Sequence, residues 1–93
     1  MLIQHKEGKT KSMFYLEQDG KIVAEMVYSK PNPDQMLIEH TEVDESLGGQ
    51  GVGKQLVHAG VEYAREHHWK IIPLCPFAKS VLDRMKEWQD VLV

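Results

Sequence analysis

The sequence predicts a single α+β domain spanning residues 1–93, with a mixed sheet built from an antiparallel meander and a later strand–loop–helix–strand–helix unit. Three observations favour this class. The first half carries short strand-like runs separated by tight turns. A glycine-rich loop, residues 48–54, then follows an apolar run. After this loop the apolar residues recur at helical spacing. A chain of 93 residues is long enough for one core and too short for two domains.

Four strands are expected before the loop. Their residues are mostly β-branched, aromatic or alternating apolar and polar, and their ranges are 2–7, 11–17, 22–28 and 36–43. Asp19-Gly20 between the second and third run is the signal of a two-residue hairpin. Residues 29–34 contain two prolines and predict a loop. Connections this short predict antiparallel neighbours.

The second half predicts a helix, a strand and a second helix. The first helix starts near Val52 and stops near His67, and its apolar face collects Val52, Leu56, Ala59, Gly60, Tyr63, Ala64 and His67. Residues 70–75 read as a fifth strand, parallel to the fourth, with Pro73 marking a sheet edge or a bulge. Pro76 suits the start of a second helix over residues 77–86. For residues 89–93 the sequence leaves open whether they dock on the sheet.

Composition narrows the functional classes. A formal net charge of −3 argues against a general nucleic-acid or membrane-surface binder. One cysteine permits no internal disulfide and suits a reducing cytoplasm, and we expect a cytoplasmic protein that is a monomer or weak dimer. Neither a signal-peptide core nor a membrane-spanning run is visible. His58, His67 and His68 lack a companion pair at zinc spacing, so no metal site is expected.

The glycine-rich loop indicates a phosphate-bearing ligand, because glycines before a helix let backbone N–H groups converge on an anion. A Walker A motif fails at Gln55, where Ser or Thr is needed, and a dinucleotide fingerprint fails at Leu56. A third pattern is the acetyl-CoA signature of GNAT acetyltransferases, [Arg/Gln]-x-x-Gly-x-[Gly/Ala]. Gly51 and Gly53 supply its glycines, while Gly48 replaces its Arg or Gln.

The order of elements also resembles the GNAT superfamily, and most closely its very short single-domain branch, called YjdJ-type. The resemblance covers nearly the whole chain. It is most specific over residues 40–53 and 71–77, where Ile72-Pro73-Leu74-Cys75 follows the glycine motif at the family's spacing.

This resemblance implies an acetyl-CoA-dependent N-acetyltransferase acting on an amine substrate, which is a small molecule or a protein amine. It places pantetheine contacts at Thr41 and Val43. It implies a cofactor-binding loop and a flanking helix start, comprising Gly48, Gly49, Gln50, Gly51, Val52, Gly53, Lys54, Gln55, Phe77 and Lys79. Two alternatives stay open: a CoA-binding module with little or no turnover, and a protein-interaction domain with a vestigial cofactor groove.

Two residues are candidates for catalysis. Cys75 precedes a helix start, which favours a thiolate, and is expected to act as an acyl acceptor or as a thiol lining the pocket. His40 sits late in the fourth strand and is the candidate base, since histidine titrates near neutrality.

Overall fold

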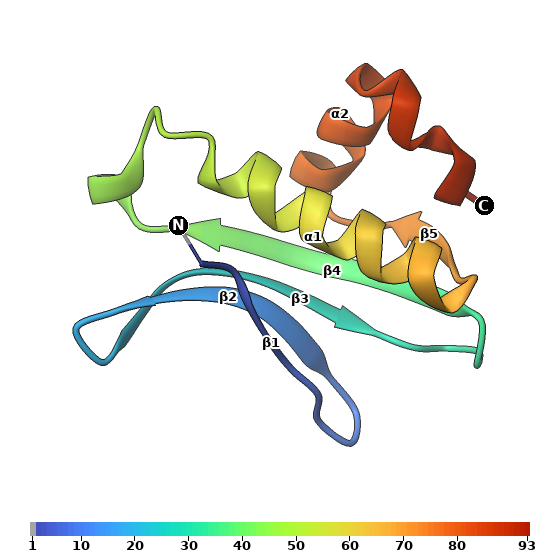
Figure 1. Cartoon of the computed structure of the whole chain (residues 1–93), viewed down its shortest axis with the longest axis horizontal. Coiled ribbons are helices and arrows are strands. Elements are labelled where there is room, and N and C mark those ends of the chain that lie inside the picture. Colours follow the sequence, from blue (N-terminus) through green and yellow to red (C-terminus); the bar gives the residue numbers. More distant parts are fainter. Residues whose placement is uncertain (1) are drawn as a thin grey trace.

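The computed structural model describes residues 2–93 and contains one five-stranded sheet with helices packed against it (Figure 1). In chain order the elements are β1 (Gln4–Lys6), β2 (Ser12–Gln18), β3 (Lys21–Ser29), β4 (Gln35–Val43), η1 (Glu45–Leu47), α1 (Val52–His67), β5 (Lys70–Pro73), α2 (Pro76–Arg84) and η2 (Lys86–Val91). None of the helices within residues 2–93 has the length and apolarity needed to cross a membrane.

The sheet topology confirms the predicted fold class. Its strand order is β1-β2-β3-β4-β5, and the first four strands are antiparallel. β5 lies parallel to β4 at the edge of the sheet, in a register that pairs Ile38 with Pro73. Asp19 and Gly20 both take positive φ, 51° and 79°, as the predicted two-residue hairpin requires. An edge strand tolerates Pro73, because a ladder N–H is not needed on its open side.

Several boundaries differ from the predicted ones. β1 is shorter than residues 2–7, and the side chain of Leu2 is 73% exposed, so no core contact holds it in a strand. β5 ends at Pro73 rather than at Cys75, because the N–H groups of Leu74 and Cys75 both turn to the carbonyl oxygen of Ile38. α2 starts at Pro76 and ends at Arg84, two residues before the predicted end.

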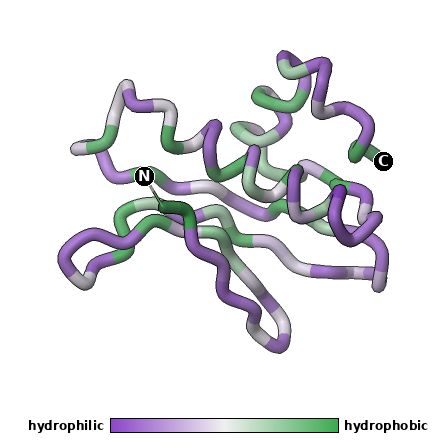
Figure 2. The backbone as a smooth tube through the Cα atoms, in the orientation of Figure 1, coloured by the Kyte–Doolittle hydropathy of each residue, from purple (hydrophilic) through white to green (hydrophobic). Residues whose placement is uncertain are grey.

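The core occupies one face of the sheet. Alternate residues of the strands point to this face and are buried against α1 and α2, as Met26, Met36 and Ile71 are. Residues between them, such as Val27 and Leu37, remain half-exposed on the opposite face. Figure 1 shows α1 lying across the sheet with α2 beside it, and Figure 2 shows hydrophobic and hydrophilic residues interspersed along the strands and the helices.

A bulge in β4 changes which residues face the core. Tyr28 pairs with Ile38, but its neighbour Val27 pairs with His40, so Glu39 is an extra residue in β4. Before the bulge, Ile38 faces the helices. After it, the odd-numbered residues face them, since Thr41 pairs with the fully buried Met26.

The C-terminal segment docks on the sheet and the helices. Trp88 and Val91 of η2 are buried, and the Trp88 ring stacks on His58 of α1 at 4.7 Å between centroids. Leu92 bridges Ile71 of β5, whose carbonyl oxygen accepts a hydrogen bond from the Val93 N–H at 3.2 Å. These contacts answer the question that the sequence left open for residues 89–93.

Candidate active site

The glycine-rich loop joins the end of β4 to the start of α1. The Asp44 carboxylate accepts a hydrogen bond from the Ser46 N–H at 2.9 Å and caps η1, which leads the chain into the loop. Gly49 and Gly51 take positive φ, 79° and 71°, which favours glycine at both positions. Gly51 is the N-cap residue of α1, so the helix begins without a capping side chain.

This loop fits an anionic group. A Cβ added at Gly49 or Gly51 would meet no atom within 4 Å, so both backbones face open space. The N–H groups of the first turn of a helix have no acceptor within the helix. Gly51 has no side chain that could accept a hydrogen bond from them. The positive end of the helix dipole lies at the same place, and the Lys54 side chain is exposed beside it. The exposed loop residues Gly48 and Gln50 and the exposed Gln55 of α1 border this opening, whereas the side chain of Val52 is buried in the core.

The role of Gly53 differs from that of Gly51. It lies within α1 without a positive φ, and a Cβ there would come within 2.6 Å of the Phe77 ring. Phe77 belongs to the first turn of α2 and is 42% exposed. Its ring therefore forms a wall beside the helix start, and the glycine makes room for that wall.

β4 extends past its neighbour and leaves an open edge. The β4–β5 pairing ends at Ile38 and Pro73, after which β5 turns away into α2. Within residues 2–93, the end of β4 from His40 to Val43 pairs with β3 alone. Its backbone groups on the β5 side are therefore available to an extended ligand. Thr41 and Val43 lie on this stretch, between the glycine loop and Cys75.

Cys75 lies where this open edge begins. It is buried as the N-cap residue of α2, and its sulfur is 3.6 Å from the Thr41 hydroxyl oxygen. Burial alone would raise the pKa of the Cys75 thiol, but hydrogen bonds from the Ala78 N–H, the Thr41 hydroxyl and the Phe77 N–H outweigh it and lower that pKa. The arrangement therefore favours the thiolate, which is the nucleophilic form of cysteine.

The structure does not bring His40 to the same place. The Glu39 bulge turns His40 to the opposite face of the sheet, paired with Val27. There its Nε2 lies 3.3 Å from a Glu25 carboxylate oxygen, and its side chain is 53% exposed. Cys75 and His40, the two residues predicted to be catalytic, are thus separated by the sheet.

The remaining predicted residues lie at the border of the site. Lys79 is exposed on α2, where its ammonium is 3.1 Å from the Asp83 carboxylate. Gly48 has an ordinary φ of −58°, and a Cβ there would approach only the Glu45 carbonyl oxygen, at 3.2 Å. A larger residue therefore fits the backbone at position 48. Residues 2–93 hold no group of three or more His, Cys, Asp or Glu side chains arranged to bind a metal ion.

The sequence predicted that the start of α2 favours the thiolate of Cys75, but not which N–H groups act on it. The N–H groups of Phe77 and Ala78 act on Cys75 through the backbone, so their side chains give no signal. Pro76 at the first helical position was the available clue, because it places Cys75 at the N-cap. Thr41 was singled out for its backbone, whereas its hydroxyl also contacts the sulfur.

An open strand edge, a glycine loop at a helix start and a polarised thiol define a domain of the acyltransferase class. Comparison with known proteins identifies the family: the family model for the GCN5-related N-acetyl-transferases matches residues 13–91. The chain belongs to this family of N-acetyltransferase enzymes.

Solved structures agree with this assignment. A GCN5-like protein from Staphylococcus aureus shares 42% identity and a TM-score of 0.75, covering 97% of this chain and 87% of its own. An IAA acetyltransferase from Bacillus cereus shares 26% identity over 68% of this chain and 43% of its own, with a TM-score of 0.57. A ribosomal-protein-alanine N-acetyltransferase from Brucella melitensis biovar Abortus is 18% identical, with a TM-score of 0.67 over 83% of this chain and 61% of its own, and shows the shared fold alone. A comparison with curated proteins found no match.

Proposed function

We propose that this protein transfers an acetyl group from acetyl-CoA to an amine, with Cys75 as the reactive group of the cleft. The observation that carries the proposal is the open edge of β4, which runs between the glycine loop and the Cys75 sulfur. An extended pantetheine arm is amide-rich, and the backbone of Thr41 to Val43 on the side away from β3 offers it hydrogen bonds, the Thr41 N–H being shared with the Cys75 sulfur.

In this proposal the two ends of the edge bind different parts of the substrate. The loop around Gly51 and the start of α1 holds the pyrophosphate, with Lys54 adding a positive charge at the rim. The Phe77 ring covers one side of that opening, and Lys79 lies further along α2. Acetyl-CoA supplies the acetyl group as a thioester, which is already electrophilic.

Cys75 then acts as the nucleophile. Its thiolate forms a bond to the acetyl carbonyl carbon, and the bond from that carbon to the sulfur of CoA breaks. The neutral amine next forms a bond to the same carbon, Cys75 leaves as thiolate, and the amine proton passes to water. The Ala78 N–H and the Thr41 hydroxyl stabilise the Cys75 thiolate before attack and after release.

Mass spectrometry of the intact protein after incubation with acetyl-CoA tests this route. We expect one added acetyl group on Cys75, which transfers to an added amine. The amine panel is a polyamine, a lysine peptide and a peptide with a free N-terminus. Cys75→Ala and Cys75→Ser should lose amide formation by orders of magnitude, whereas His40→Gln should still accept the acetyl group, because His40 lies on the other face.

Thr41→Val is the matched control for the thiol. It keeps the shape of the side chain and removes the hydroxyl that helps lower the pKa of Cys75, so thiol alkylation should need higher pH than in the parent. An unmodified Cys75 with near-parental turnover in Cys75→Ala would reduce the thiol to a lining residue. Binding of CoA without any amide product above buffer background would instead identify a CoA-binding module.

A further inference from the structure

A cluster of aromatic rings lies at the end of α1 away from the glycine loop. Val52 and His67 bound a helix of 16 residues, so the two ends are roughly 20 Å apart. Phe14 and Tyr28 of the sheet form the buried base of the cluster, with 5.6 Å between their ring centroids. Tyr63 stands above them, 5.7 Å from Phe14 in an edge-to-face arrangement.

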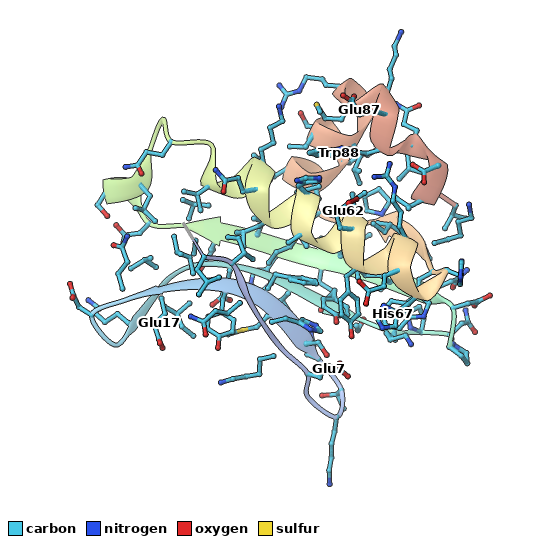
Figure 3. All side chains as sticks on the ribbon, viewed as in Figure 1. Glu7, Glu17, Glu62, His67, Glu87 and Trp88 are labelled. Carbon is cyan, nitrogen blue, oxygen red and sulfur yellow. The ribbon has the colours of Figure 1, made fainter. Side chains whose placement is uncertain are left out.

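Other rings extend this cluster to the surface. The Tyr63 ring stacks on His67 at 4.1 Å and meets Trp69 edge-on at 5.4 Å between centroids. A cavity of about 330 Å³ opens beside them and is lined by Tyr28, Tyr63, His67 and Trp69 together with Glu7. Figure 3 shows Glu7 of the β1–β2 connection at the same end of the molecule as His67. The size of the cavity is within the range of small-ligand pockets.

The ring faces and Glu7 of this cavity attract an organic cation, whereas the ammonium groups of Lys9 and Lys30 at its rim oppose one. Ring faces carry the negative part of the aromatic quadrupole and attract ammonium groups. Burial raises the pKa of Tyr28 to about 12, and burial together with the Glu7 carboxylate raises that of Tyr63, so both phenols stay neutral. Glu7 itself accepts a hydrogen bond from the Tyr63 hydroxyl at 3.0 Å. The cavity thus combines ring faces and one fixed carboxylate with two lysine ammonium groups, so an external cation needs a lysine to move away.

The chain already places an alkylammonium on one of these rings. The Lys30 nitrogen lies 3.6 Å from the centroid of the Trp69 ring. Lys30 is exposed and begins the loop between β3 and β4, so its side chain is free to leave without disturbing the core. A second lysine at the rim, Lys9, also lines the cavity and is exposed, but no ring contact to it is found within residues 2–93.

We propose that this aromatic cavity is a second binding site, for a lysine-like alkylammonium group from outside the chain, with Lys30 as its internal competitor. The site is separate from the acetyl-transfer cleft and does not depend on acetyl transfer. Lys30 occupies the Trp69 face when the site is free, and an external ammonium displaces it while Glu7 balances the charge.

NMR titration tests the proposal, because the two indole N–H signals report on two different places. Trp69 lines the cavity, whereas Trp88 is stacked on His58 in the core and serves as an internal reference. The probes are n-pentylammonium and, as its uncharged counterpart, n-pentanol, both at pH 8. We expect pentylammonium to shift the Trp69 signal saturably, with little effect of pentanol and little change at Trp88.

Two lysine variants give the decisive comparison. Lys30→Met removes the internal competitor and should tighten pentylammonium binding by at least roughly fivefold. Lys9→Met removes the same charge from the same rim, but Lys9 contacts no ring within residues 2–93. It should tighten pentylammonium binding by less than about twofold. Glu7→Gln should weaken binding in the parent.

Either of two results would overturn the proposal. Equal shifts with pentylammonium and pentanol would show an unselective apolar pocket. Equal affinities in Lys30→Met and Lys9→Met would show that Lys30 does not compete for the Trp69 ring. Both outcomes can be measured without disturbing the core, since Lys30 and Lys9 are exposed.

Discussion

Gly51 and Gly53 near the start of α1 have different structural roles, although both are glycines of the same motif. Gly51 has a φ of 71°, a conformation that side chains with a Cβ rarely adopt. Gly53 is helical, and its missing Cβ is what admits the Phe77 ring. A substitution at each position therefore fails for a different physical reason.

Gly51→Ala should destabilise the fold by about 1–2 kcal/mol, because the left-handed backbone strains an L-residue even though the space around it is open. Chemical denaturation measures the change. Gly48→Ala is the matched control, since φ at Gly48 is an ordinary −58° and its cost should be small. Equal losses for both variants would refute the role of the Gly51 conformation.

Gly53→Ala should weaken CoA binding and stability because its Cβ displaces the Phe77 ring. Most of this loss should disappear in a Phe77→Ala background, where the ring is absent. A double-mutant cycle followed by denaturation and calorimetric CoA titration gives the coupling, which we expect to be on the order of 1 kcal/mol for residues in contact. Strict additivity would contradict the contact.

At the scale of elements, β1 has only three residues, and His5 is its main attachment to the core. The His5 ring stacks on Phe14 at 4.4 Å between centroids, and its Nε2 is 2.6 Å from the Tyr28 hydroxyl. Burial lowers the pKa of His5, while Glu7 raises it and His67 lowers it further, with a net decrease from 6.5. The docked strand therefore prefers neutral His5.

We expect His5 to make the free energy of unfolding decrease as the pH is lowered. A histidine with a lowered folded pKa contributes its full stabilisation above its unfolded pKa, near 6.5, and loses it as the pH falls through the folded pKa. Urea denaturation between pH 7.5 and 5 should show a smaller decrease in His5→Phe, which keeps the stack and does not titrate. His68→Asn is the control, because His68 is exposed in a left-handed C-cap that asparagine tolerates. An unchanged slope in His5→Phe would contradict the assignment.

How much of the structure the sequence predicts also differs from one element to the next. α1 was predictable from Val52 to His67, because helical periodicity is strong over four turns and Gly51 marks its start. The burial of Val57 and Val61 was not predicted. His67, which was predicted on the apolar face, is exposed and stacks on Tyr63 instead. The position of His40 was beyond the sequence, since no residue type demands a bulge at Glu39.

For the whole molecule, helices cover one face of the sheet and a single core joins β2, β3, β4 and β5 to the helices. The cleft is formed by parts that meet only in the folded chain: the loop after β4, the start of α2 and the open edge of β4. The cofactor loop was predictable because its glycines are local. The contact of Cys75 with Thr41 spans 34 residues, so it depended on the fold.

Because these parts meet only when folded, CoA should stabilise the entire domain. At about 100 times Kd, ligand binding adds roughly 2.7 kcal/mol. For a domain of this size each kcal/mol raises Tm by about 4–8 °C. Thermal unfolding with CoA should show the shift, and pantetheine, which lacks the pyrophosphate, should shift Tm less. A flat response to millimolar CoA would remove the cofactor assignment.

The Glu39 bulge also means that the chemistry of the cleft depends on how β4 pairs with β3. Replacing Glu39 with another residue leaves the pairing of His40 with Val27 and of Thr41 with Met26 in place. Deleting Glu39 would remove the bulge and still leave these pairs, so Thr41 would stay on the helix side. If Glu39 itself paired with Val27, the rest of the strand would slip by one residue and exchange its two faces, turning His40 toward Cys75 and Thr41 away. A slip of one residue in this pairing would thus change the cleft more completely than most substitutions within it.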